Sequence, residues 1–151
     1  MRWADLPWRS GASATRAEGP VSVRSASMRA SQRVVQVCLF VLAAIAIGGG
    51  LLQMVLGQPA TTPRLDNVHR FMAGVYLSTG IIALWAGATV REQGTLVYLL
   101  AFGVLMAAIG RLISIATVGL PEPSSLWLGY LVPELVLPVV MVLAHRAGKA
   151  A

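Results

Sequence analysis

The sequence predicts an all-α integral membrane protein, an up-down four-helix bundle that follows a disordered basic leader. Composition is the first observation behind this class. Hydrophobic residues make up 56% of the chain and charged residues 12%, which is about half the charged fraction of a soluble domain. The second observation is a set of four apolar runs, each long enough to cross a hydrocarbon core of about 30 Å.

The predicted leader covers residues 1–32, and the predicted membrane domain covers residues 33–151. The leader is rich in Ala, Ser and Arg and holds no apolar run that spans a membrane. That bias is typical of a transit peptide or a polybasic arm. We favour the interpretation that the true start is Met28, directly before Arg29, Arg33 and the first apolar run, and that the residues before it are a spurious extension.

The predicted helices cover residues 34–56, 71–90, 95–118 and 126–145. The first is too long for the apolar region of a signal peptide, and three more follow it. The connections are short and carry helix breakers, which are Gly57, Pro59, Pro63, Pro121 and Pro123. Short connections favour antiparallel neighbours, so consecutive helices are expected to pack side by side.

The basic residues predict the orientation. Nine of the 12 lysines and arginines fall on the face that holds the leader, the turn at Arg91 and the C-terminal tail. This face is expected to be cytoplasmic, with both termini inside. The excess of positive charge then fits a membrane surface, and no nucleic-acid-binding motif is present.

Two opposite charges lie inside the apolar runs, Arg111 in the third and Glu134 in the fourth. A charge at membrane depth is costly, so it usually faces a partner or a wet cavity. Counting the rise along each helix places both at roughly 10–12 Å from the same end. We therefore expect them to form an intramembrane charge pair, which is either a structural staple or part of a binding site.

Other polar groups gather at the same end and predict a polar pocket open to the outside. Pro133 and Pro138 add to it, because neither can donate a hydrogen bond to the preceding turn. The candidate pocket residues are Arg70, Ser114, Tyr130, Asp66, His69 and Gln53.

Small residues at four-residue spacing predict how the helices pack. Apolar burial cannot drive helices together in lipid, whereas close approach at small residues can. The pairs Ala46–Gly50 and Ala83–Gly87 are examples. Packing within one chain and a homodimer seam are both open interpretations.

No catalytic or metal-binding motif stands out, so no cofactor and no metal site is predicted. The lone Cys38 closes no intrachain disulfide and fits a small buried residue. An enzymatic role is not favoured, although the sequence does not decide it.

Three segments carry a family resemblance: residues 65–76 (LDNVHRFMAGVY), residues 110–114 (GRLIS) with a following Gly-Leu-Pro, and residues 133–135 (PEL). With these, the chain resembles the bacterial membrane family catalogued as domain of unknown function 4345, over about residues 33–146. The resemblance implies four helices, an inner-membrane location and no assigned activity. It also implies that Arg70, Arg111, Ser114 and Glu134 are shared polar positions.

Two functions follow as expectations. The first is a non-enzymatic accessory or scaffold subunit in the bacterial inner membrane, held by the Arg111–Glu134 pair and meeting a membrane-protein partner or a second copy. A fold-level likeness to the small four-helix scaffold of eukaryotic sterol demethylation favours it. The alternative is a lipid- or small-molecule-binding protein, or a transporter component, that uses the pocket at Arg70, Arg111 and Glu134.

Overall fold

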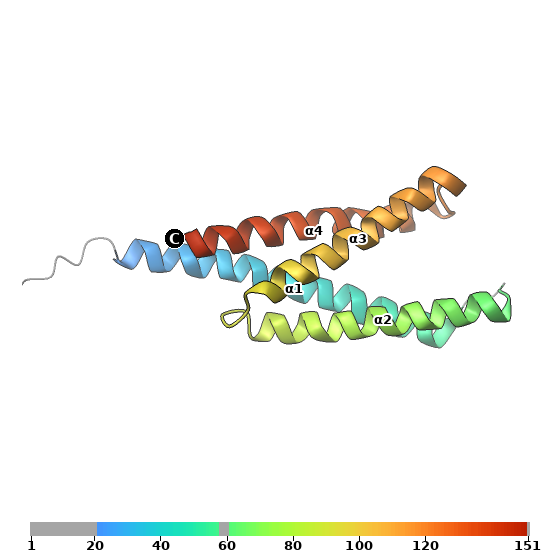
Figure 1. The fold of residues 1–151 in the computed structure, drawn as a ribbon, viewed down its shortest axis with the longest axis horizontal. Coiled ribbons are helices and arrows are strands. Elements are labelled where there is room, and N and C mark those ends of the chain that lie inside the picture. Colours follow the sequence, from blue (N-terminus) through green and yellow to red (C-terminus); the bar gives the residue numbers. More distant parts are fainter. Residues whose placement is uncertain (1–20, 58–60, 151) are drawn as a thin grey trace, which may run out of the picture.

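The computed structural model describes residues 21–57 and 61–150, and this part of the chain folds into four helices without strands. They are α1 (Val21–Leu56), α2 (Pro63–Ala88), α3 (Thr95–Val118) and α4 (Ser124–Ala150) (Figure 1). All four are long and apolar enough to cross a membrane. The predicted all-α four-helix architecture is confirmed, and the chain is a multi-pass membrane protein.

The helix α1 begins at Val21, well before the predicted start at residue 34. Residues 21–32 were expected to belong to a disordered leader, but they continue the helix. The sequence has no Gly or Pro from Val21 to Ile47, so nothing stops the apolar segment from propagating its helix towards the N-terminus. The remainder of the predicted leader, residues 1–20, lies outside the described residues.

The helix α2 also begins earlier than predicted, at Pro63 instead of Phe71. Thr62 caps it, because its hydroxyl accepts a hydrogen bond from the Leu65 amide (3.3 Å) and Pro63 suits the first helical position. The polar residues Asp66, His69 and Arg70 therefore lie on the first turns of a helix instead of a loop.

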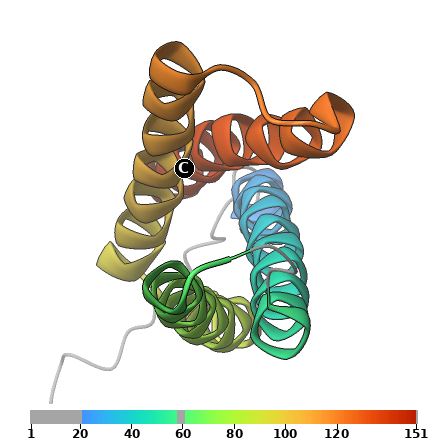
Figure 2. The ribbon, with the colours of Figure 1, turned by 90° about the vertical axis from the view of Figure 1, so that its right-hand side faces the viewer.

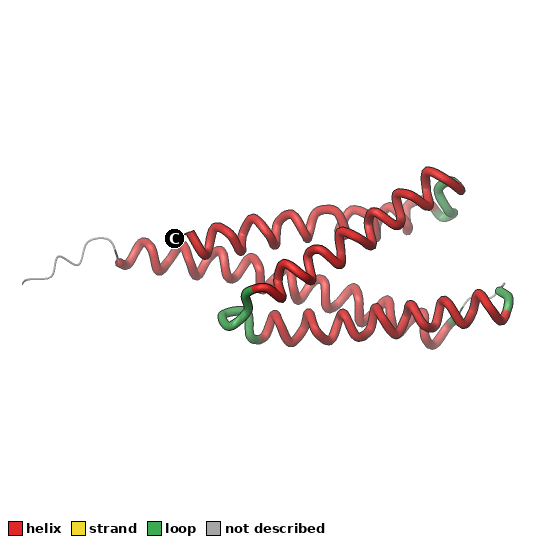
Figure 3. Tube along the Cα trace, in the orientation of Figure 1, coloured by secondary structure: helices red, strands yellow, loops and turns green. Residues whose placement is uncertain are grey.

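The bundle has two ends. The end with the α2–α3 turn and the C-terminus is called the turn end, and the end with the α1–α2 and α3–α4 connections is called the loop end (Figures 1 and 3). At the loop end, Gly57 has a φ of 60° and its amide donates to the Gln53 carbonyl (3.1 Å), which closes α1.

The closest helix contact is the seam between α1 and α2. A Cβ atom on Gly80 would lie 2.8 Å from the Ile47 backbone nitrogen, and one on Gly50 would lie 3.0 Å from the Ala73 carbonyl oxygen. Only glycine allows backbones this close. The predicted pair Ala46–Gly50 thus packs within the chain, against α2, and so does Ala83–Gly87 against α1.

The buried core lies in the turn half of the bundle. Its largest fully buried side chains are Leu39, Met141, Val35 and Val97. In contrast, no residue from Ile109 to Tyr130 is buried, and none of the described residues of α2 before Ala73 is. Tight packing therefore ends about midway along the helices.

Consecutive helices do not all pack side by side. The helix α1 packs on α2 and α4, and α3 packs on α4, but α2 and α3 barely touch beyond the turn that joins them. Figures 1 and 2 show α3 diverging from α2 towards the loop end. The expected adjacency is wrong for this pair. Gly103 and Gly110 of α3 have no atom within 4 Å of a Cβ position, so this helix offers no small-residue seam to α2.

Candidate ligand-binding site

The two intramembrane charges are in contact. The Nε atom of Arg111 donates to Oε2 of Glu134 at 2.7 Å, which is the contact expected from their equal depth. The Glu134 side chain is 12% exposed and that of Arg111 is 25% exposed. The carboxylate is therefore well enclosed, whereas the guanidinium keeps an open side.

Tyr76 of α2 completes a triangle with this pair. Its hydroxyl donates to Oε1 of Glu134 at 3.2 Å and accepts from Nη2 of Arg111 at 3.1 Å. Among the described residues, α2 forms no other hydrogen bond with α3 or α4 than these two. One phenol thus bridges the gap where the backbones have separated.

Aromatic rings surround the rest of the guanidinium. The Cζ atom of Arg111 lies 5.9 Å from the Trp127 ring centroid and 5.6 Å from that of Tyr130, within the range of cation–π attraction. A bidentate pair would use two guanidinium nitrogens on one carboxylate, but here Nε binds Glu134 and Nη2 binds Tyr76. Among the described residues, Nη1 has no hydrogen-bonding partner.

A cavity of about 510 Å³ lies on the open side of Arg111. Its walls come from all four helices, and α2 and α3 supply most of them. The polar lining residues are Gln53, His69, Tyr76, Arg111, Ser114 and Trp127. Two buried nitrogens on these walls, Nδ1 of His69 and Nε1 of Trp127, have no hydrogen-bonding partner in the described structure.

A smaller, mostly apolar cavity of about 80 Å³ lies on the other side of the triangle, between Tyr76, Tyr130 and Glu134 and the turn half of the bundle. Tyr76 and Ala107 line both spaces. The polar triangle therefore closes the floor of the large cavity.

The predicted pocket residues divide into three groups. Gln53, His69 and Ser114 line the large cavity with Arg111, whereas Tyr130 lines the small one and flanks the guanidinium. Asp66 and Arg70 lie apart from both and were not expected to pair. Arg70 binds Asp66 (2.8 Å) and the Met54 carbonyl (2.7 Å), so it fastens the end of α1 to α2 instead of lining the cavity.

Sequence comparison adds one decisive observation. A family model described as Domain of unknown function (DUF4345) matches residues 34–145, which is most of the membrane domain. The chain belongs to this family. No curated protein and no solved structure matches it.

Sequence reasoning missed two members of the site in this DUF4345 protein, Tyr76 and Trp127. Tyr76 was placed in the family-like segment but not in the pocket, because a tyrosine within an apolar span is ordinary. Its position in the sequence could have indicated its role, because Tyr76 follows His69 by seven residues and therefore lies on the same face of α2. Nothing in the sequence marked Trp127 as an orphaned donor.

The DUF4345 site presents hydrogen-bond donors to its cavity. Within the described residues, no group of three or more His, Cys, Asp and Glu side chains is arranged to hold a metal ion. The donors Nη1 of Arg111 and Nε1 of Trp127 have no partner among the described residues, whereas both carboxylate oxygens of Glu134 are already engaged by Arg111 and Tyr76. The cavity thus suits a molecule that accepts hydrogen bonds.

Proposed function

We propose that this DUF4345 protein binds an amphipathic small molecule or lipid in the large cavity at the loop end. The observation that carries the proposal is the open side of Arg111, which is held by Glu134 and Tyr76 yet faces about 510 Å³ of space with unused N–H groups. Ligand pockets typically span about 300–1,000 Å³. A purely structural staple needs no such space, so this geometry favours the binding role over the accessory or scaffold role.

The ligand is expected to carry a hydrogen-bond-accepting head, such as a carboxylate, phosphate or carbonyl group. Its head would take bonds from Nη1 of Arg111 and from Nε1 of Trp127, and the buried Trp127 donor otherwise remains unsatisfied at a cost of about 1–3 kcal/mol. Its apolar body would lie along Met72, Met106 and Ala107. A bulky cation has no free carboxylate to meet on these walls.

The divergence of α2 and α3 supports entry from the bilayer. These two helices form most of the cavity walls and barely touch at this end, and many of their exposed side chains, such as Phe71, Met72 and Ile113, are apolar. We therefore expect a lipid-soluble molecule to reach Arg111 sideways between α2 and α3, without passing through the core of the bundle.

The test is to purify the full chain from native membranes and to identify retained molecules by mass spectrometry. Gly110→Leu is the blocking variant, because Gly110 lines the cavity and has no atom within 4 Å of its Cβ position. Gly48→Leu is the matched control, since its Cβ position is equally free but lies outside the cavities described above. We expect wild type and Gly48→Leu to retain the molecule and Gly110→Leu to lose it.

Two results would contradict the proposal. One is a wild-type protein that carries no molecule but holds a stoichiometric protein partner, which supports the scaffold role. The other is equal retention in Gly110→Leu and Gly48→Leu, which places the molecule elsewhere.

We also propose that the turn end faces the cytoplasm and that the protein resides in a bacterial inner membrane. Arg33, Arg91, Arg146 and Lys149 lie at the turn end, and the leader adds further arginines to the same side in sequence. The loop end has Arg64 and Arg70, and Arg70 is paired with Asp66. This asymmetry supports the orientation with both termini inside.

A further inference from the structure

Two neighbouring cavities lie at the turn end, away from the Arg111 site. The larger, about 430 Å³, lies between α1 and the α2–α3 turn, and the smaller, about 160 Å³, lies between that turn, α1 and α4. Gln32, Val90 and Arg91 line both. Arg91 thus lies between two adjoining cavities, which together are called the turn-end hollow and are surrounded by α1, α2, α4 and the α2–α3 turn.

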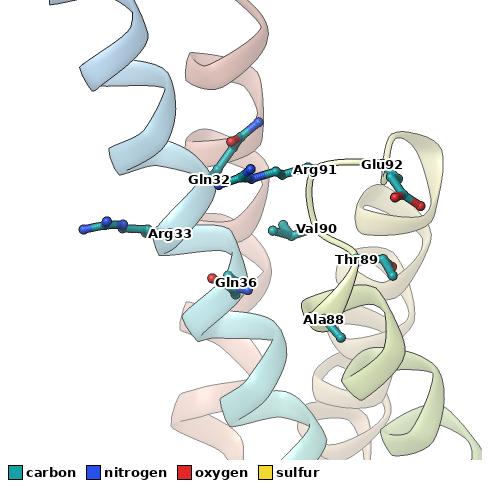
Figure 4. Close-up of a pocket in the computed structure, with 8 residues that line it drawn as sticks. All are labelled: Gln32, Arg33, Gln36, Ala88, Thr89, Val90, Arg91 and Glu92. Carbon is teal, nitrogen blue, oxygen red and sulfur yellow. The ribbon is translucent and has the colours of Figure 1, made fainter.

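The charge of this hollow is positive and unbalanced. Arg91 and Lys149 line the smaller cavity together, and Arg33 lines the larger one. The single acidic residue in either lining is Glu92, which forms no ion pair among the described residues. Figure 4 shows Arg91 reaching from the turn towards Gln32 on α1, while Glu92 lies on the far side of the turn.

Lys149 and Gln36 are held in place beside the two cavities. Lys149 is held over the Tyr98 ring, with Nζ 5.3 Å from its centroid. The amide of Gln36 donates to the Gly87 carbonyl (3.0 Å), which fixes α1 against the end of α2 beside the larger cavity.

The depth of the hollow indicates where the anion comes from. The candidate membrane span of α2 ends at Ala88 and that of α3 begins at Thr95, so the lining residues Val90 and Arg91 lie at the boundary of the apolar stretches. That boundary is where lipid phosphates lie, and basic pockets between helices at this level bind anionic headgroups.

We propose that the turn-end hollow binds a phosphate-bearing anion, with Arg91 and Lys149 as its charged partners and an anionic lipid headgroup as its source. This site is independent of the amphiphile site, because the two lie at opposite ends of the bundle. Blocking the loop-end cavity with Gly110→Leu therefore leaves the turn-end site intact.

The experiment measures binding of dihexanoyl phosphatidylglycerol and dihexanoyl phosphatidylcholine to the full chain in a neutral detergent. We expect the wild type to prefer phosphatidylglycerol. A basic residue near an anionic surface contributes about 1 kcal/mol, so Arg91→Gln and Lys149→Gln should each weaken that binding about fivefold. Arg146→Gln is the matched control, because Arg146 is an exposed cation on the same end of α4 that lines neither cavity.

Inorganic phosphate provides the second arm. Competition by phosphate at millimolar concentration assigns the site to a free phosphate group as well as a headgroup, whereas no competition assigns it to the lipid. Equal binding of both lipids to the wild type would overturn the proposal, as would an equal loss in Arg146→Gln. If Arg91→Gln fails to fold, Arg91→Lys must retain binding while Lys149→Gln loses it.

Discussion

Arg111 contacts Glu134 through a single nitrogen, although a guanidinium offers two parallel donors to a carboxylate. The second edge is turned to Tyr76 and to the cavity. The residue therefore combines two roles: Glu134 offsets the cost of its charge, and the remaining N–H groups stay available. Its aromatic neighbours, Trp127 and Tyr130, restrict it to this pose.

Removing the counter-charge should destabilise the bundle. In Glu134→Gln, Arg111 keeps its charge at membrane depth without a carboxylate, and Tyr76 loses its anionic acceptor. Breaking a buried pair costs about 3 kcal/mol at the lower end of the usual range, which suits a guanidinium that is one-quarter exposed. The measurement is thermal unfolding of the purified protein in detergent.

The double variant Arg111→Met with Glu134→Leu is the control for that prediction. It removes both charges while keeping similar volumes, so most of the lost stability should return. A double variant that is as unstable as Glu134→Gln would show that neither charge depends mainly on the other. The recovered protein should also lack the amphiphile, because the donors of Arg111 are gone.

At this scale the sequence predicted the charged residues well and their neutral partners poorly. Arg111 and Glu134 were found because a charge in an apolar run is costly and rare, and helical rise fixes its depth. Tyr76 was not found, because a phenol in a span is ordinary and its partners depend on how far the helices separate. Arg70 was placed in the pocket by proximity in sequence, but its nearest acceptors are Asp66 and Met54.

The helices differ in how closely they pack, and the seam between α1 and α2 is the tightest. Gly80→Ala should push these helices apart, because the new Cβ would lie 2.8 Å from the Ile47 backbone nitrogen, which cannot move as a side chain does. Overpacking of this kind costs about 1–3 kcal/mol, more than alanine gains in helix propensity. Thermal unfolding in detergent measures the loss.

Gly48→Ala on α1 makes the same chemical change where no atom lies within 4 Å of the Cβ position. It should leave the melting temperature unchanged or raise it slightly. Equal effects of the two substitutions would mean that the close approach at Gly80 does not hold the helices together.

The number and identity of the helices followed from apolar run length, and the small-residue pairs noted in the first two apolar runs lie in the close seam between α1 and α2. The divergence of α2 from α3 did not follow, because short connections fix which ends meet but not the crossing angle beyond them. Helix starts were placed too late wherever polar residues without breakers preceded the apolar run, as at Val21 and Pro63.

The whole molecule has one strongly basic end, and its proposed orientation is testable by labelling. In a Cys38→Ala background, Leu120→Cys places a thiol in the exposed α3–α4 connection and Ala150→Cys places one at the turn end. A membrane-impermeant maleimide applied to intact cells should label Leu120→Cys alone, because the basic end is retained in the cytoplasm. Labelling of Ala150→Cys instead would invert the orientation.

Because α2 and α3 separate towards the loop end, we expect lipid or detergent molecules to contact the side chains along the gap between them. A void beside Met72 and Met106 would forfeit van der Waals contacts on both walls, so acyl chains of the bilayer, or detergent tails, fill whatever the helices leave open. The turn half holds the buried core around Leu39 and Met141. The stability of the loop half is expected to depend on the lipid or detergent that fills the gap. The melting temperature of the protein should therefore change when a different amphiphile is used.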